Sequence, residues 1–204
     1  MTLSKPLIKV CGLTRPQDAS LAAVLGADLC GFIFHPKSPR YISPAQARLM
    51  TTPGAKRVGV FVDQSAEETR QIMEEAGLDL AQLHGHQGPE MADFLGPEKV
   101  IKVFWPDKQP RDELSKLLEL WKDLCAYFLF DAGFFEGGHG RRIESELPVS
   151  PKRYLLAGGL NPKTVKTFWP SADPMLAGFD LNSGLEESPG CKEAESLEVL
   201  LPWR

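Results

Sequence analysis

Two polar residues that end apolar runs have side chains suited to moving protons. Cys11 follows the run 7–10, and Asp131 follows the run 127–130. A thiolate can remove a proton from carbon and a protonated carboxyl can donate one, so the two residues suggest a general acid–base pair. A structural role fits each residue equally well when it is taken alone. A free cysteine is commonly a small buried apolar group, and an aspartate in apolar surroundings commonly caps a helix or pairs with a cation.

Two glycine-bearing segments suggest a phosphate site. Gly158 and Gly159 follow one apolar run. A later run is followed by Asn182, Ser183 and Gly184. Glycine lets backbone N–H groups approach a phosphate closely, and a serine adds a hydroxyl donor. Ordinary turn glycines are the alternative, but their presence in both segments favours phosphate binding.

A third group of candidates could contact a substrate. Arg40 lies in a segment stiffened by Pro36 and Pro39, which suits a bidentate contact with a carboxylate. A solvated surface arginine is the commoner outcome for such a residue. His84 is more often a hydrogen-bonded histidine than a catalyst. The histidines have no metal-ligand spacing, so we predict no metal site.

The elements that must position these residues are short strands alternating with helices. The eight expected strands are 7–11, 28–34, 57–62, 80–83, 100–104, 127–131, 154–157 and 175–180. Strand–helix repetition is typical of a parallel sheet. A chain of 204 residues divided into eight such units predicts one (β/α)8-barrel domain of minimal size over 1–204. An open doubly wound sheet is the alternative, but it usually has fewer strands, and the turn at 11–14 lacks a GxGxxG fingerprint.

The expected helices begin and end at typical signals, such as proline in the first turn, a capping box or a final glycine. They cover 16–25, a segment that opens at 43–44, 65–76, 111–123 and 192–201. The sixth unit is the weakest, because only the short charged segment 141–146 follows its strand.

In such a barrel, the active site lies where strands end and the following loops begin. The residues at these positions are mostly polar: Cys11, the loop 35–40, Asp63, His84, Asp131, Gly158, Gly159, Asp180, Asn182, Ser183 and Gly184. The first and sixth strands lie across the barrel mouth from each other. Cys11 and Asp131 are therefore expected on opposite sides of one pocket.

Composition narrows the classes of partner and location. A net charge of −4 without a basic tail gives no electrostatic attraction to nucleic acid or anionic membrane. No apolar run reaches the length of a membrane span and no secretory signal opens the chain, so we expect a cytoplasmic protein. The four cysteines have no CxxC spacing, which favours free thiols. Cys30, Cys125 and Cys191 are expected to pack in the core.

The ordered motifs resemble those of the phosphoribosylanthranilate isomerase family along the whole chain. They are 8–15 (IKVCGLTR), 31–41 (GFIFHPKSPRY), 58–62 (VGVFV), 82–85 (QLHG), 129–131 (LFD), 137–140 (GGHG), 155–162 (LLAGGLNP) and 180–186 (DLNSGLE). The first two motifs are specific, and the order of the whole series is more so.

This resemblance implies an Amadori rearrangement in tryptophan biosynthesis, the third step from chorismate. N-(5-phosphoribosyl)anthranilate becomes 1-(2-carboxyphenylamino)-1-deoxyribulose 5-phosphate, and no cofactor is needed. Cys11 matches the base that takes the C2 proton, and Asp131 matches the acid that opens the ring. Arg40 matches the residue that holds the anthranilate carboxylate. The resemblance also implies that the two glycine-bearing loops bind the phosphate of this small substrate, in a monomer or homodimer.

The sequence departs from the family pattern in the loops around the site. His139 stands where threonine is usual, and Asn182 stands where serine is frequent. His84 and His139 are possible substrate contacts. Catalysis needs the Cys11 thiolate, and a cation such as Lys9 or Arg40 is expected to lower the pKa of that thiol.

Two other functions fit parts of the pattern. The histidine-pathway isomerase performs the same rearrangement on another phosphoribosyl substrate, but it should end its first strand with a carboxylate and show two similar halves. A non-catalytic phosphate-binding barrel would have no need of both Cys11 and Asp131.

Overall fold

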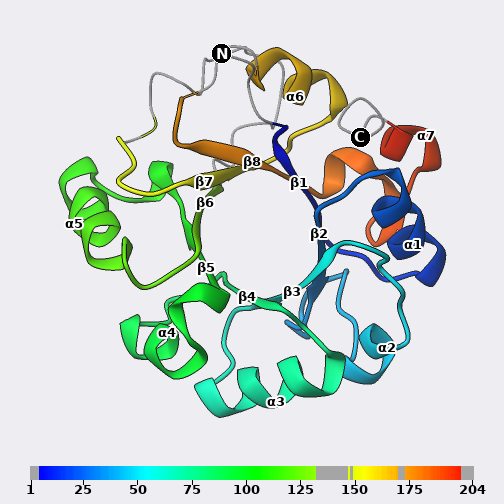
Figure 1. Cartoon of the computed structure of the whole chain (residues 1–204), viewed down its shortest axis with the longest axis horizontal. Helices are drawn as coiled ribbons and strands as arrows, with labels where there is room; N and C mark the ends of the chain where they lie inside the picture. The colour runs from blue at the N-terminus through cyan, green and yellow to red at the C-terminus, as the bar shows by residue number, and fades with distance from the viewer. Residues whose placement is uncertain (1–4, 132–146, 148, 170–172, 199–204) are drawn as a thin grey trace.

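Eight parallel strands close into a barrel in chain order, and helices surround it on the outside (Figure 1). The computed structural model describes residues 5–131, 147, 149–169 and 173–198. The strands are β1 (Leu7–Val10), β2 (Leu29–Ile33), β3 (Lys56–Phe61), β4 (Leu80–Leu83), β5 (Val100–Phe104), β6 (Tyr127–Asp131), β7 (Tyr154–Ala157) and β8 (Leu176–Leu181). The predicted (β/α)8 fold and its eight strands are confirmed, with bounds that differ by one residue at most.

The helices of the described residues lie between successive strands or after the last one. They are α1 (Pro16–Leu25), α2 (Pro44–Arg48), α3 (Ala66–Ala76), α4 (Pro89–Leu95), α5 (Arg111–Trp121), α6 (Pro162–Phe168) and α7 (Ala194–Leu197). The end signals act as expected: Pro16 opens α1, and Ser65 and Glu68 cap α3 reciprocally. Helices α4 and α6 were not predicted.

Strand alternation divides the apolar residues into an inner and an outer core. Residues of the inner cluster fill the barrel: Leu29, Val58, Leu80, Ile101, Val103, Leu129, Leu155, Ala157 and Ala177. A larger outer cluster packs the other strand faces against the helices. Leu7 packs against the inner cluster, and because every second residue of a strand shares a face, Lys9 and Cys11 also point inward.

A register shift between β7 and β8 brings a carboxylate to the inner face. The shift falls at Tyr154/Leu155, where Leu155 pairs with Gly178 rather than Ala177. Such an irregularity changes the face of the sheet to which the following side chains point. Ala177 therefore belongs to the inner cluster, while Asp180, three residues later, also faces the interior.

The C-terminal part differs from the sequence expectation. Instead of a helix starting at Lys192, a short hairpin forms from β9 (Glu186–Ser188) and β10 (Cys191–Lys192), and the helix starts at Ala194. Cys30 and Cys125 are buried as expected, but the prediction is wrong for Cys191, which is only partly buried in the hairpin. Segment 141–146 lies outside the described residues.

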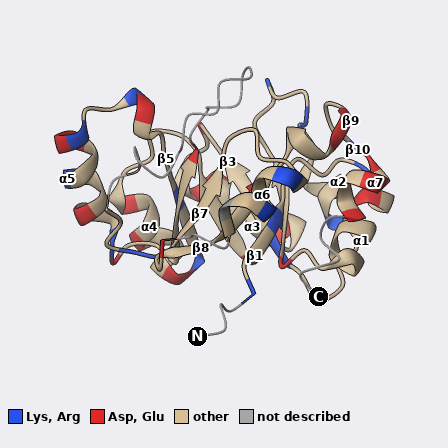
Figure 2. Ribbon diagram, turned by 90° about the horizontal axis from the view of Figure 1, so that it is seen from above, with Lys and Arg blue, Asp and Glu red and all other residues tan. Residues whose placement is uncertain are grey.

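Charged residues of both signs occur on the outer helices (Figure 2). In the ribbon of Figure 2, α5 carries both acidic (red) and basic (blue) residues. None of the helices in the described ranges has the length and apolar character of a membrane-spanning segment.

Candidate active site

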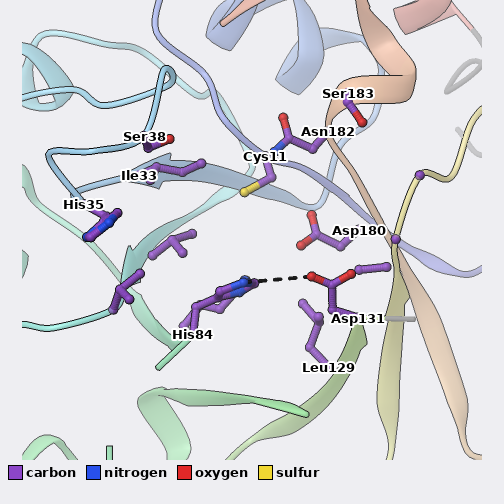
Figure 3. A pocket seen from close by; sticks show the side chains of 16 residues that line it. Cys11, Ile33, His35, Ser38, His84, Leu129, Asp131, Asp180, Asn182 and Ser183 are labelled. Carbon is purple, nitrogen blue, oxygen red and sulfur yellow. Dashed lines mark ion pairs between the residues drawn. The ribbon is translucent and has the colours of Figure 1, made fainter. Parts of the chain in front are cut away.

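A cavity of about 350 Å³ opens at the carboxyl ends of the strands. Residues at or just after the ends of β1, β2, β3, β4, β6, β7 and β8 line it. Seven residues given a candidate catalytic or binding role from the sequence are among them: Cys11, His84, Asp131, Gly158, Gly159, Asn182 and Ser183. Cys11 and Asp131 thus share one cavity (Figure 3).

The thiol side of the cavity is held by strands β1 and β8. Cys11 follows β1, and its backbone N–H donates to the Leu181 carbonyl at 2.8 Å. The residue is only 4% exposed. Its Sγ atom lies close to the backbone of β2, since a Cβ on Gly31 would stand 2.9 Å from it. Only glycine at this position leaves room for the thiol.

A buried ion pair lies directly beneath the thiol. Lys9 Nζ donates to Asp180 Oδ2 at 2.8 Å, and both side chains are almost entirely shielded from solvent. The residues are neighbours because Lys9 pairs with Asp180 in the β1–β8 register. Burial by itself lowers the pKa of Lys9. Interactions with Asp180 and Cys11 raise this pKa by a larger amount, so it lies above its ordinary value and the ammonium form is stabilised.

The protonation of Cys11 differs from the sequence expectation. The Lys9 charge does lower the pKa of Cys11, as expected of a nearby cation. Burial, the largest cause, and the Asp180 charge raise that pKa by more, so it lies above its ordinary value. The prediction of a lowered thiol pKa is therefore wrong, because the nearby cations Lys9 and Lys192 do not offset burial and the Asp180 charge.

The carboxyl side is more open. Asp131 ends β6 with its side chain 27% exposed, and its Oδ2 lies 3.9 Å from His84 Nε2. The His84 ring meets the Trp105 ring edge-on at 5.2 Å between centroids. Burial lowers the pKa of His84 despite the opposing effect of Asp131, so the imidazole is neutral at neutral pH. Its Nδ1 has no hydrogen-bond partner within the described residues.

The two glycine-bearing loops meet at one edge of the cavity. Gly158 and Gly159 have φ angles of 103° and 63°, which disfavour other residues. A Cβ on Gly184 would stand 2.1 Å from the Leu160 carbonyl oxygen, so the two loops are in direct contact. Ser183 opens the short 3₁₀ turn η5 (Ser183–Leu185) and lines the cavity. Backbone N–H groups and a hydroxyl are thus available for an anion.

Comparisons with known proteins agree with this geometry. Residues 8–201 match the family model described as N-(5'-phosphoribosyl)anthranilate (PRA) isomerase. A relative of that name from Desulfovibrio desulfuricans is 48% identical over 200 residues, covering 96% of this chain and 93% of the relative. Another from Maridesulfovibrio salexigens is 46% identical over 195 residues, covering 94% of each. The chain belongs to the N-(5'-phosphoribosyl)anthranilate isomerase family.

Solved structures of this isomerase family have the same fold. The phosphoribosyl anthranilate isomerase of Thermotoga maritima is 30% identical, with a TM-score of 0.82 over 96% of this chain and 97% of that one. The corresponding structure from Thermus thermophilus is 37% identical, with a TM-score of 0.77 over 97% of each chain. The family and fold expected from the sequence motifs are confirmed.

Arg40 lies behind the cavity rim rather than among the lining residues. Its Nε and Nη2 bind the Glu186 carboxylate, with an Nη2–Oε2 distance of 2.6 Å. Lys192 Nζ binds the same carboxylate at 2.8 Å. Burial raises the pKa of Glu186, but the hydrogen bonds and charges of Arg40 and Lys192 together lower it by more, so the carboxylate is charged. Both Arg40 nitrogens in these contacts, Nε and Nη2, are engaged with Glu186.

The remaining sequence candidates occupy different positions. Lys192 Nζ also donates to Asn182 Oδ1 at 3.0 Å, so this side chain is engaged with the hairpin. Asp63 pairs with His35 at 3.5 Å and does not line the cavity. His139 lies outside the described residues. Within the described ranges, no group of three His, Cys, Asp or Glu residues is arranged to hold a metal ion.

Sequence reasoning missed the polar residues of the cavity floor and rim. Lys9 was considered only as a nearby cation, and Asp180 was noted as a strand end without a role. Gln82 lines the cavity with an Oε1 that has no partner among the described residues. The available signal was alternation, because Lys9 and Gln82 each stand two residues before a predicted site residue on the same strand face.

Proposed function

We propose that this chain catalyses the Amadori rearrangement of N-(5-phosphoribosyl)anthranilate to 1-(2-carboxyphenylamino)-1-deoxyribulose 5-phosphate. The observation that carries the proposal is the presence of Cys11 and Asp131 in one cavity whose edge is built from two glycine-bearing loops. Family membership supports the same reaction. The reaction belongs to tryptophan biosynthesis.

The phosphate end and the anthranilate end of the substrate bind at different parts of the cavity. The phosphate binds at Gly158, Gly159 and Ser183, where backbone N–H groups and a hydroxyl are available. Gly184 lets the second loop pack on the first, and Asn182 anchors it to the hairpin. The anthranilate carboxylate faces the β2 loop and Arg40 Nη1. This orientation puts the ribose between the thiol and the carboxyl.

Asp131 performs the first proton transfer. Its protonated carboxyl donates to the furanose ring oxygen as the bond from that oxygen to C1 breaks. The nitrogen lone pair forms the C=N bond, which gives an open-chain Schiff base with a positive nitrogen. The partial exposure of Asp131 allows it to recover a proton from solvent after each turnover.

Cys11 performs the second transfer. The positive imine nitrogen draws electrons from the neighbouring carbon and makes the C2 proton acidic. The Cys11 thiolate removes this proton, and the electron pair moves into a C1–C2 double bond to give an enolamine. The imine is the electron sink, so the reaction needs no cofactor. General acid and base groups each typically contribute about 10²- to 10⁴-fold.

The nearest rival is the rearrangement of the histidine-pathway substrate. That enzyme is expected to carry a carboxylate at the end of its first strand, whereas this chain has a thiol there. A glycine pair follows β7 at the edge of the cavity. A chain with two similar halves would have an equivalent glycine pair after β3, and the residues described there contain none. These two features favour the anthranilate substrate.

The oligomeric state and cellular location of the enzyme are proposed from the sequence. We propose a cytoplasmic enzyme that acts as a monomer or homodimer. A structure of the related Thermotoga maritima protein is described as monomers derived from a dimeric isomerase, which makes either state compatible with this fold.

The direct test is loss of the fluorescence of N-(5-phosphoribosyl)anthranilate in the presence of the purified chain. We expect first-order fluorescence loss that is proportional to protein concentration and competitively inhibited by inorganic phosphate. Turnover of the histidine-pathway substrate alone would assign the rival activity. Binding of either substrate without turnover would assign the chain to the non-catalytic phosphate-binding barrels.

A further inference from the structure

The last step of the proposed reaction lacks an assigned proton acceptor. The enolamine becomes a ketone when C1 gains a proton and the C2 hydroxyl loses one. Cys11 holds the proton taken from C2 and can return it to C1. Asp131 has already given its proton to the ring oxygen. A further group must receive the hydroxyl proton.

Asp180 has a carboxylate oxygen free for this purpose. Its Oδ2 is bound by Lys9, but its Oδ1 has no hydrogen-bond partner among the described residues. The residue is 8% exposed and lines the same cavity as Cys11 and Asp131. A buried acceptor without a partner costs free energy, so such atoms are uncommon and commonly have a role.

The position of Asp180 fits the C2 end of the substrate. It is the strand neighbour of Lys9, one inward-facing position below Cys11. Figure 3 shows its carboxylate between Cys11 and Asp131. Electrostatic interactions join it to both residues, which agrees with a place between them. A carbon within reach of the thiol would hold its hydroxyl near Asp180 Oδ1.

We propose that Asp180 is a third catalytic residue, which accepts the proton of the C2 hydroxyl as the enolamine becomes the ketone. This inference rests on the proposed function. In the step, the thiol of Cys11 gives its proton to C1 and returns to thiolate. The C1–C2 π electrons form the new C1–H bond. The electrons of the O–H bond form the C2=O bond as the proton moves to Asp180 Oδ1.

Both carboxyl groups must then regain their starting protonation states. Each turnover leaves Asp131 without a proton and Asp180 with one, so solvent exchange through the open cavity restores both. Burial and the nearby charge of Asp131 together raise the pKa of Asp180 by more than Lys9 and Lys192 lower it, which makes the carboxylate a better acceptor than an exposed aspartate. Lys9 is a positioning residue, because it fixes Oδ2 and leaves Oδ1 directed at the substrate.

Deuterium exchange into the product isolates this step. The purified protein is incubated with 1-(2-carboxyphenylamino)-1-deoxyribulose 5-phosphate in D₂O, and the deuterium at C1 is measured by mass spectrometry. The ketone must return to the enolamine for exchange to occur, which requires Cys11 and Asp180 but no ring opening. We expect one deuterium at C1 with the wild-type protein and with Asp131→Asn. With Asp180→Asn, we expect exchange to fall about 10²-fold or more.

A second pair of variants guards against misfolding of Asp180→Asn, which leaves Lys9 charged and unpaired. Lys9→Met/Asp180→Asn carries no buried charge at this position, and Lys9→Met alone is its matched control. Both are checked by circular dichroism, and exchange should be slower in the double variant than in Lys9→Met. Wild-type exchange rates in Asp180→Asn or equal rates in the matched pair would overturn the proposal. So would a wild-type protein that isomerises its substrate without exchanging C1, whereas absence of isomerisation would refute the proposed function itself.

Discussion

The two sides of the cavity hold their proton-transfer groups in different ways. On the β1–β8 side, Cys11 is 4% exposed above a Lys9–Asp180 pair at 2.8 Å that is shielded from solvent. On the opposite side, Asp131 is 27% exposed, and its contact with His84 spans 3.9 Å, longer than a hydrogen bond. The first arrangement is tight and dry, and the second is loose and open to solvent.

This difference teaches that burial and charge compensation must be considered together. A buried thiol resists ionisation, and the ammonium groups of Lys9 and Lys192 do not offset that resistance, because the Asp180 carboxylate opposes them. The tight side fixes the base and the register of the strands around it. The open side lets an acid exchange protons with solvent between turnovers.

The largest expected effects come from removing one proton-transfer group on each side. Cys11→Ala and Asp131→Asn should each lower kcat/KM about 10²- to 10⁴-fold with little change in folding. The fluorescence assay with purified variants measures this. Cys30→Ala is the matched control, because Cys30 is a buried thiol of the outer core and should keep near wild-type activity. Near wild-type rates in either active-site variant would remove that residue from the mechanism.

The tightness of the β1–β8 side predicts a large effect on stability. Lys9→Met leaves Asp180 buried without its partner and should lower the free energy of unfolding by about 3–5 kcal/mol. Urea unfolding followed by circular dichroism gives this value. The exposed Arg70–Glu74 pair is the control, since Arg70→Ala should cost less than about 1 kcal/mol. Equal losses in the two variants would mean that the buried pair is not a structural anchor.

The pH dependence of the rate should report the base on the buried side. Burial raises the pKa of Cys11, and the thiol is inactive when protonated, so kcat/KM falls as pH drops below that raised value. Cys11→Asp should move this fall to lower pH, because an ordinary aspartate has a pKa of about 3.9 against about 8.5 for cysteine. A profile of kcat/KM from pH 5 to 10 tests this. An unmoved limb would assign it to another group.

The open side predicts a smaller effect for its second residue. The partly exposed contact between His84 and Asp131 is worth less than about 1 kcal/mol, so His84→Gln should lower kcat by less than about tenfold. The neutral state of His84 implies that the loss does not depend on its charge near pH 7. Kinetics at two pH values check both points. A loss as large as that of Asp131→Asn would make His84 part of the chemistry.

Residues governed by local rules were predictable from the sequence. The eight strands follow from apolar runs, and α3 follows from its Ser65–Glu68 box. Cys11 and Asp131 follow from their places at strand ends. Helices α4 and α6 are seven residues each, too short for a strong periodic signal. The β9–β10 hairpin replaces a pattern that fits a helix, because Glu186 and Lys192 are fixed by tertiary ion pairs.

The residues of the cavity floor could not be predicted from the sequence, because their arrangement depends on contacts between distant parts of the chain. The pairing of Lys9 with Asp180 joins residues far apart in the chain and needs barrel closure. The side chain of Asp180 points inward because of the β7–β8 register shift, and no pattern in the neighbouring sequence predicts that shift. The pKa of Cys11 depends on the balance between burial and Lys9, and only the three-dimensional arrangement gives that balance.

The most direct test of the central claim is a crystal structure of this chain with reduced 1-(2-carboxyphenylamino)-1-deoxyribulose 5-phosphate. That ligand is present in a related isomerase structure that is 28% identical to this chain. We predict the phosphate at Gly159 and Ser183, Cys11 Sγ against C2, and the Asp131 carboxylate against O4 from the opposite side. A ligand that touches only one of Cys11 and Asp131, or that binds outside their shared cavity, would contradict the account.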